Sequence, residues 1–348
     1  PRTFADLVET FGSPQQVLTA SPAALREIPG VGAKLVEAIV SAEQTDVQPQ
    51  LDLCRRNGIE VMAQSSVDYP RLLNEIYDPP SILFCAGQLQ TVDEIAISIV
   101  GTRHATHYGK KVAESLARSL ALAGVTIVSG MARGIDAVAH RAALAAGGRT
   151  IAVLGGGLLN VYPPEHDGLA HEIAQQGAVL SESLPMAAPK SGSFPRRNRI
   201  VSGISLGVIV IEAGSRSGAL ISARMAMEQG REVFAVPGRI DSRMSQGCHQ
   251  LLRDGAKLVQ NADDVLEELG PLVVPTRVGE EVVVRKPAEL KLSEQESRVL
   301  NSIHSEPTSF DAVVDATGIP VARVLSTISV LEMRKLIRRL SGTSFVRT

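Results

Sequence analysis

Short apolar runs rich in β-branched residues alternate with alanine-rich segments between residues 95 and 269. Continuous apolar strands that are separated by helices are typical of a mainly parallel sheet with helices on both faces. This alternation predicts a doubly wound α/β core over residues 61–270, in which ligands bind at the carboxyl ends of the strands. The predicted strands are residues 95–100, 125–128, 150–154, 178–180, 206–211, 232–236 and 257–259.

The residues before this core, 1–60, have the apolar spacing of short helices. Residues 25–39 read LREIPGVGAKLVEAI and resemble a helix-hairpin-helix (SAM-like) unit, a family of nonspecific DNA-binding elements. Gly30 and Gly32 leave backbone N–H groups open to a phosphate, with Lys34 alongside, so a secondary DNA contact is one interpretation. The other interpretation is a hairpin that only packs or binds protein.

The chain after the core begins with a stretch rich in proline and valine, which predicts an extended linker over residues 271–291. Ser293 and Glu296 then form a capping box at the start of a third unit, 292–348. Three helices and a terminal hairpin resemble a winged-helix domain. The helix in the recognition position has Arg323 as its one basic side chain, so we expect protein contact at least as much as DNA readout. The helices are predicted around 299–303, 310–316 and 321–332, and the hairpin at 336–340 and 344–347.

Length and composition exclude several protein classes. The chain has 348 residues, of which 44% are hydrophobic and 21% charged, so most of it should fold, in two or three domains. No apolar run approaches the roughly 18 residues that span a bilayer, and the first residues do not have the basic, apolar and small-residue pattern of a signal peptide. Cys54, Cys85 and Cys248 lie far apart and form no CxxC pair. We therefore expect a cytoplasmic protein with no membrane span, no metal and no cofactor.

Positive charge is concentrated in two segments, although the net charge of the whole chain is −2. Residues 101–145 hold six basic and two acidic side chains, and residues 189–200 hold four basic and no acidic ones. A nucleic acid responds to the local field of one face and not to the total charge. The two segments therefore favour a polyanionic ligand, and the alternative is that they are solvated helix faces.

The loop after the first predicted strand of this alternating region, residues 101–111, reads GTRHATHYGKK. It lacks the GxGxxG of a dinucleotide site, and Lys111 stands where a Walker A loop needs serine or threonine. Arg103 follows a glycine at a strand end, and Lys110 and Lys111 lie at a helix N-terminus. This arrangement suits an anion without metal or hydride chemistry.

Further blocks follow the later strands, and together with GTRHATHYGKK they resemble the DNA-processing protein A family (DprA/Smf). The resemblance implies a Rossmann-like fold that binds single-stranded DNA, forms a homodimer and helps to load RecA recombinase in natural transformation and homologous recombination. It implies no catalytic reaction. The blocks are SGMARGIDAVAH (129–140), LGGGLLNVYPPEH (154–166), FPRRNRIVSG (194–203), EAGSRSGALISA (212–223) and FAVPG (234–238).

The family motifs can be carried onto this chain by position. Arg103 matches the arginine of the family's GSR motif, although Thr102 replaces the usual serine. Residues 194–199 match the FPxRNR block, and Ser217 and Gly218 match the SG turn before a helix. Lys190 lies in the segment that precedes the FPxRNR block, where the match to the family is less regular. The predicted DNA contacts are Arg103, Lys110, Lys111, Lys190, Phe194, Arg196, Arg197, Asn198, Arg199, Ser217 and Gly218.

Phe194 gives the arginine-rich block a second property that single-strand binding needs. Such binding combines cations for the phosphates with aromatic faces for the bases. Aromatic residues make up only 3% of the chain and tryptophan is absent, so a phenylalanine among arginines is notable. We predict that it lies in an exposed loop and stacks on a base; the alternative is that it anchors that loop in the core.

Other residue patterns indicate weaker candidates. Asp136 and His140 are four residues apart on a predicted helix and could bind a metal, but without a third ligand a buried hydrogen-bonded pair is favoured. Ser129 and Ser181 are discounted as nucleophiles because no partner histidine or aspartate is indicated. Two rival functions stay open: hydrolysis of a nucleotide or nucleotide-sugar on the same sheet, and regulation through duplex DNA bound by the end units.

Overall fold

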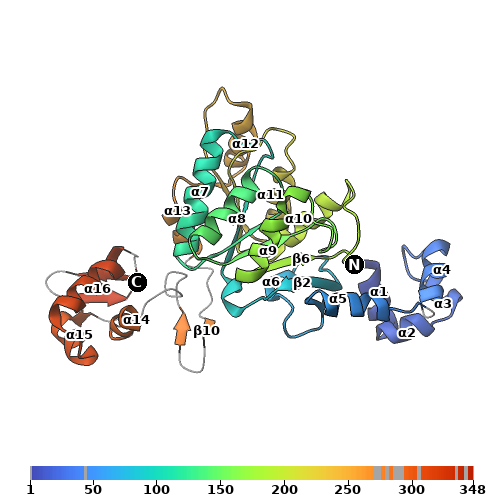
Figure 1. Cartoon of the computed structure of the whole chain (residues 1–348), viewed down its shortest axis with the longest axis horizontal. Helices are drawn as coiled ribbons and strands as arrows, with labels where there is room; N and C mark the ends of the chain where they lie inside the picture. Colours follow the sequence, from blue (N-terminus) through green and yellow to red (C-terminus); the bar gives the residue numbers. More distant parts are fainter. Residues whose placement is uncertain are drawn as a thin grey trace.

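The computed structural model describes residues 2–42, 45–269, 276–278, 282–284, 294–303, 307–333, 336–340 and 344–347. They form a helical unit at the N-terminal end, a large α/β core and a small unit at the C-terminal end (Figure 1). No helix in these ranges is both long and apolar enough to cross a lipid bilayer.

One nine-stranded sheet organises the core. The strands from β6 to β9 in its spatial order are parallel, whereas β2 is antiparallel to β6 and β1 is antiparallel to β2. All seven predicted strands are confirmed. The spatial order is β1 (Ile59–Ala63), β2 (Ile82–Gly87), β6 (Ala178–Ser181), β5 (Thr150–Val153), β4 (Thr126–Ser129), β3 (Ala96–Val100), β7 (Gly207–Val210), β8 (Glu232–Ala235) and β9 (Lys257–Leu258).

The first two strands of the sheet were not predicted, and they shift the start of the core. Strand β1 begins at Ile59, so the predicted boundary between residues 60 and 61 falls inside a strand. Helix α5 (Gln48–Arg56) also packs here, because its Cys54 belongs to the same apolar cluster as Ile59 and Phe84.

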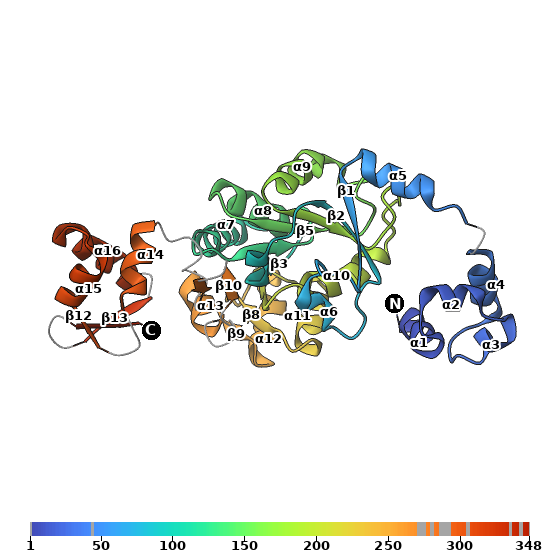
Figure 2. The same cartoon turned by 90° about the horizontal axis from the view of Figure 1, so that it is seen from below.

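Helices cover both faces of the sheet, which confirms the doubly wound prediction (Figure 2). Apolar side chains of the helices pack on each face of the continuous apolar strands, which is the arrangement that a parallel sheet requires. One face carries α5, α7 (His107–Leu122), α8 (Ile135–Ala145), α9 (Asp167–Gln176) and α13 (Ala262–Leu269); the other carries α6 (Arg71–Asn74), α10 (Ser193–Gly203), α11 (Ala219–Glu228) and α12 (Gln246–Arg253). Short 3₁₀ turns lie at η1 (Thr91–Glu94), η2 (Pro164–His166) and η3 (Arg243–Ser245).

The two end units each have an apolar core of their own. The N-terminal unit contains α1 (Arg2–Phe11), α2 (Pro14–Thr19), α3 (Pro22–Arg26) and α4 (Ala33–Ala42), as the helical reading predicted. The predicted three helices and hairpin of the C-terminal unit are also confirmed, with one short strand added. These elements are α14 (Glu294–Asn301), β12 (Thr308–Ser309), α15 (Phe310–Thr317), α16 (Val321–Met333), β13 (Ile337–Arg339) and β14 (Ser344–Arg347).

Part of the predicted linker is folded. Strands β10 (Thr276–Val278) and β11 (Val282–Val284) pair as an antiparallel hairpin, so the prediction of a continuous extended linker over 271–291 is wrong there. Valine has a high β propensity, so the valines of this stretch suit a ladder as well as an extended chain. The rest of the predicted linker, and Ser293 of the predicted capping box, lie outside the described residues.

The strand order reverses at β3, which pairs with β4 on one side and with β7 on the other. The connections that leave β3 and β7 therefore diverge to opposite faces of the sheet. Ligands of open α/β sheets bind in the crevice that such a switch point opens beyond the carboxyl ends of the strands.

Candidate functional site

A cavity of about 680 Å³ lies at this switch point. Its walls are the loop after β3 (residues 101–104), the start of α10, the turn into α11 (residues 214–222) and η3. Four arginines line it, Arg103, Arg197, Arg216 and Arg243, together with one carboxylate, Asp136. The sequence-based expectation of a basic site at the strand ends therefore agrees with the geometry.

Three of the lining arginines supply exposed positive charge. Arg103, Arg216 and Arg243 are exposed, and none of them forms an ion pair within the described ranges. Arg216 and Arg243 were not predicted. Arg216 directly precedes the predicted Ser217, and Arg243 follows strand β8, so the rule that sites lie after parallel strands could have found both.

Polar side chains join the two sides of the cavity. Asn198 of α10 directs its Nδ2 toward the carbonyl oxygen of Gly218, 3.4 Å away, at the start of α11. Ser217 and Gly218 line the cavity as predicted from their position, and Ser217 Oγ accepts from Ala219 N at 3.3 Å. The structure thus brings the FPRRNR block and the SG turn together.

Phe194 lies at the first turn of helix α10, so the prediction that it sits in an exposed loop is wrong. Pro195 fits this position because proline is tolerated in a helix's first turn. One side of the Phe194 ring packs over Gly155, where an added Cβ would lie 3.0 Å from the ring. The ring is half-buried and lines the cavity, and the guanidinium carbon of Arg103 lies 5.5 Å from its centroid.

Arg197 is buried beneath the cavity, with 7% of its surface exposed. Its Nη1 donates to the carbonyl oxygen of Val153, and the guanidinium occupies the space that Gly130 leaves by having no side chain. Burial lowers the pKa of Arg197 to about 10, and the nearby charge of Asp136 opposes that shift. Burial likewise raises the pKa of the Asp136 carboxyl, against the positive charge of Arg197. Both side chains line the cavity, and the charge of each favours the ionised form of the other.

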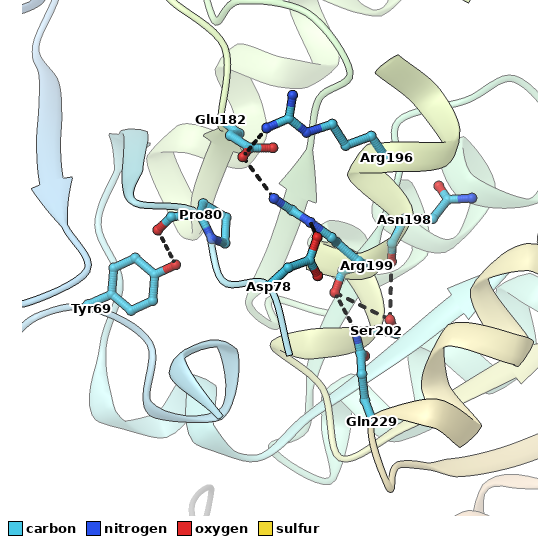
Figure 3. A network of polar contacts seen from close by, with 9 residues as sticks. All are labelled: Tyr69, Asp78, Pro80, Glu182, Arg196, Asn198, Arg199, Ser202 and Gln229. Carbon is cyan, nitrogen blue, oxygen red and sulfur yellow. Dashed lines mark hydrogen bonds and ion pairs between the residues drawn. The ribbon is translucent and has the colours of Figure 1, made fainter. Parts of the chain in front are cut away.

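Arg199 points away from the cavity into a buried ion-pair network (Figure 3). Its Nε donates to Asp78 Oδ2 at 2.9 Å and its Nη2 donates to Glu182 Oε1 at 2.8 Å, while only 5% of the side chain is exposed. Arg196 donates to the same Glu182 oxygen at 2.7 Å, but 57% of its side chain is exposed. This burial argues against the predicted DNA contact of Arg199, which instead fixes α10 to two other segments of the core.

The start of α7 is already occupied by a carboxylate of the protein. Thr106 caps the helix, and Glu212 accepts from Thr106 N at 2.9 Å and from Thr106 Oγ1 at 2.5 Å. Gly109 makes room for this carboxylate, because a Cβ there would collide with it. The predicted anion site at this helix N-terminus is therefore filled by Glu212. Lys110 and Lys111 are exposed on α7 but do not line the cavity.

The remaining predicted DNA contacts lie outside the cavity. Lys190 is exposed in the loop before α10, and it is not a lining residue. In the N-terminal unit, Gly30, Gly32 and Lys34 are all exposed between α3 and the first turn of α4. The positive φ of +84° at Gly30 requires glycine in that turn. A DNA contact at each of these positions stays a prediction.

The weaker candidates have structural roles. Asp136 and His140 are both buried, but the predicted hydrogen bond between them is wrong, because His140 Nδ1 pairs with Thr150 Oγ1 at 2.7 Å and Asp136 accepts from Ala132 N at 3.2 Å. Within the described ranges, no group of three side chains could hold a metal ion.

The two serines that were considered as nucleophiles are fully buried. Ser129 Oγ donates to Ile99 O and Ser181 Oγ donates to Gly156 O, each at 2.6 Å. The first bond joins the end of β4 to β3, and the second joins the end of β6 to the loop after β5.

Comparisons with known proteins agree on one family. The model of DNA recombination-mediator protein A matches residues 60–270, a DprA winged helix domain matches 284–343, and a SAM-like helix-hairpin-helix tandem matches 1–44. Protein Smf from Synechocystis is 34% identical over all of this chain and 95% of its own length.

Two solved structures share the fold. DNA processing protein A from Streptococcus pneumoniae aligns with a TM-score of 0.67 and 38% identity, over 76% of this chain and 92% of that one. DNA processing protein A from Helicobacter pylori, a protein whose single-stranded DNA binding mode has been described, aligns with a TM-score of 0.55 and 34% identity, over 61% of this chain and 95% of that one.

Proposed function

The chain belongs to the DNA recombination-mediator protein A family, and we propose that it binds single-stranded DNA in the cavity at the β3–β7 switch point as part of DNA processing. The H. pylori relative has a single-stranded DNA binding mode. The cavity of the present chain supplies the chemistry that such a ligand needs, which is positive charge beside a half-buried aromatic ring that lines the cavity.

The observation that carries the proposal is the pairing of Arg103 with Phe194 at the cavity wall. The guanidinium carbon lies 5.5 Å from the ring centroid, so one group can neutralise a phosphate while the other stacks on the attached base. Arg216 and Arg243 extend the positive surface along the strand ends. We therefore narrow the proposed main contacts to these three arginines, Phe194 and the polar groups of Asn198, Ser217 and Gly218.

We propose a binding function and not an enzymatic one. The serine hydroxyls near the strand ends are buried and donate to main-chain carbonyls, which leaves neither Ser129 nor Ser181 as a nucleophile. Hydrolysis of a nucleotide or nucleotide-sugar by this chain would count against the proposal.

Two further parts of the proposal rest on the family likeness. A homodimer would place two basic cavities on one particle and lengthen the site beyond one cavity. The dimer would then present a single strand to RecA recombinase during homologous recombination and natural transformation. Sedimentation at micromolar protein, with and without DNA, tests the dimer, and an exclusively monomeric protein would remove it.

The binding site is tested by measuring the affinity for single-stranded and duplex oligonucleotides at three salt concentrations. Arg103→Ala should weaken single-strand binding and flatten the plot of log K against log salt by about 0.7, the value for one lost phosphate contact. Arg118→Ala is the matched control, because Arg118 is an exposed arginine of the same basic segment that does not line the cavity. An unaltered affinity and slope for Arg103→Ala would contradict the assignment.

A further inference from the structure

Two aromatic rings and two guanidinium groups form a row that extends beyond the cavity. Arg103 lies over Phe194, the Phe194 ring centroid lies 5.6 Å from that of Tyr162, and the guanidinium carbon of Arg133 lies 5.8 Å from the Tyr162 centroid. These residues come from the loop after β3, the start of α10, the loop after β5 and the loop before α8. Four separate segments thus place two neighbouring rings between two cations.

Tyr162 is the member of this row that the cavity does not include. It is 40% exposed, and it is not among the lining residues of the cavity. Its ring contacts the Phe194 ring, and the guanidinium of Arg133 lies over it. An aromatic ring that is fixed by two neighbours but exposed to solvent loses little freedom when a ligand stacks on it.

We propose that Tyr162 is a second stacking platform, which takes the nucleobase adjacent to the one on Phe194. This proposal rests on the proposed function, and it gives the strand a direction: it leaves the cavity over the loop of residues 154–166. Aromatic rings bind single strands without sequence preference, because every base has a π face. The ligand class is therefore a single strand that extends at least one nucleotide beyond the part inside the cavity.

The geometry of the two rings favours two bases on two platforms over one base between them. A base held between parallel rings would need centroids roughly 7 Å apart, twice the 3.4 Å rise of stacked bases. The rings of Tyr162 and Phe194 are closer, at 5.6 Å, and are tilted by 53°. Each ring therefore presents its own face, and a strand that passes from one to the other must turn its bases.

The cation at the far end of the row is neutralised by the protein. Arg133 donates to both carboxylate oxygens of Glu165, at 2.5 Å and 3.0 Å. Tyr162 and Arg133 therefore contribute a stacking surface with little net charge, whereas Arg103 contributes positive charge. Loss of Tyr162 should weaken binding without changing its salt dependence.

The experiment uses the full chain and unlabelled oligothymidylate. Tyr162→Ala should lower the affinity about tenfold with an unchanged salt slope, and Tyr162→Phe should restore it, because phenylalanine keeps the ring. Tyr77→Ala is the matched control, since Tyr77 is 73% exposed and does not line the cavity. Equal affinity of Tyr162→Ala and the parent chain would overturn the proposal.

A second readout does not require a disruptive variant. The chain has four tyrosines and no tryptophan, so its ultraviolet emission comes from tyrosine. Stacking on Tyr162 should quench part of this emission when the oligonucleotide binds, and Tyr162→Phe should bind equally well with that part of the quenching gone. Undiminished quenching in Tyr162→Phe would overturn the proposal.

A double variant separates stacking from bracing. If a base stacks on Tyr162 itself, Tyr162→Ala lowers the affinity further in a chain that already carries Phe194→Ala. If Tyr162 only holds the Phe194 ring in place, Tyr162→Ala has no further effect in that chain, and the proposal fails. Loss of binding in Phe194→Ala and Arg103→Ala with no loss in Tyr162→Ala would reject the second platform and keep the proposed function. Absence of single-strand binding in the parent chain would reject both.

Discussion

Two segments of the core carry its densest positive charge, and they differ in how much of that charge is buried. In residues 101–145, Arg103 is exposed at the cavity and Lys110 and Lys111 are exposed on α7. In residues 189–200, Arg197 and Arg199 are buried at 7% and 4% exposure and are bonded to a carbonyl and to carboxylates. The first segment keeps these three cations at the surface, whereas the second buries two of its four, which hold the helix that bears Phe194, and leaves Lys190 and Arg196 exposed.

This contrast shows why arginines of the two segments have different roles. A buried guanidinium requires partners, because an unpaired interior charge is costly, and those partners cancel the charge that an external anion would feel. Arg199 therefore contributes to the position of α10 and hence of Phe194. Exposed Arg103 contributes attraction and a salt-dependent affinity.

The largest expected effect is on stability, from Arg199→Ala. Removing this guanidinium leaves Glu182 and Asp78 without their buried partner, which should lower the free energy of unfolding by about 3 kcal/mol. Chemical denaturation measures this, with Arg103→Ala as the comparison, which should stay within about 0.5 kcal/mol of the parent chain. Equal free energies of unfolding for Arg199→Ala and Arg103→Ala would contradict the distinction between interior and surface arginines.

Phe194→Ala should cost about 1 to 3 kcal/mol of single-strand binding and leave the salt slope unchanged. The half-buried ring also packs on Gly155, so some stability should be lost, but less than the 3 to 5 kcal/mol or so typical of a fully buried phenylalanine. Binding and melting temperature measured on the same variant distinguish these roles. Normal binding by Phe194→Ala would remove stacking at this position.

The same contrast between interior and surface predicts a pH dependence at His140. Burial, together with the positive charges of His166 and Arg197, lowers the pKa of His140 to about 3 in the folded protein. An unfolded histidine titrates near pH 6.5, so between these values the unfolded chain binds the extra proton and stability falls as pH falls. The slope well below pH 6.5 should approach about 1.4 kcal/mol per pH unit.

Urea denaturation between pH 7 and pH 5 measures this slope. His140→Gln should flatten it, whereas His171→Gln, at an exposed histidine, should not. A parent chain whose stability is constant over this range would contradict the prediction.

The smallest effect is expected at Lys110 and Lys111. Both lie outside the cavity, on a helix whose N-terminus already holds Glu212, so they add only long-range attraction. Replacing both with alanine should reduce affinity severalfold at low salt and hardly at all near physiological salt. A loss as large as that of Arg103→Ala would place a phosphate on α7 and revise the boundary of the site.

The fold was predictable wherever the strands are buried on both faces. Residues 95–100 and 206–211 are almost wholly apolar, and such runs signal central parallel strands. Strands β1 and β2 lie on the antiparallel side of the sheet, where β1 has two successive exposed positions, Glu60 and Val61. Strand β2 is a short apolar run, and periodicity alone does not distinguish such a run from a buried helix segment. Strand β1 pairs with β2, and β2 pairs with β6, whose residues come much later in the chain.

The site was predictable in its location but not in the direction of its side chains. Residue spacing put the basic blocks after the strands, and the cavity lies there. It could not show that Arg199 turns toward Asp78, a residue outside every motif, or that Tyr162 lies against Phe194. Both facts depend on tertiary packing between segments that are distant in sequence.

The switch point has a consequence for how the protein is made. The cavity needs the loop after β3 and the turn after β7, and β7 is the neighbour that closes one side of β3. A growing chain that has not yet reached residue 207 therefore exposes β3 as an open sheet edge and has only part of the cavity wall. Insertion of β7 closes the open edge of β3, and the cavity wall is complete only when the turn into α11 and η3 have also been added.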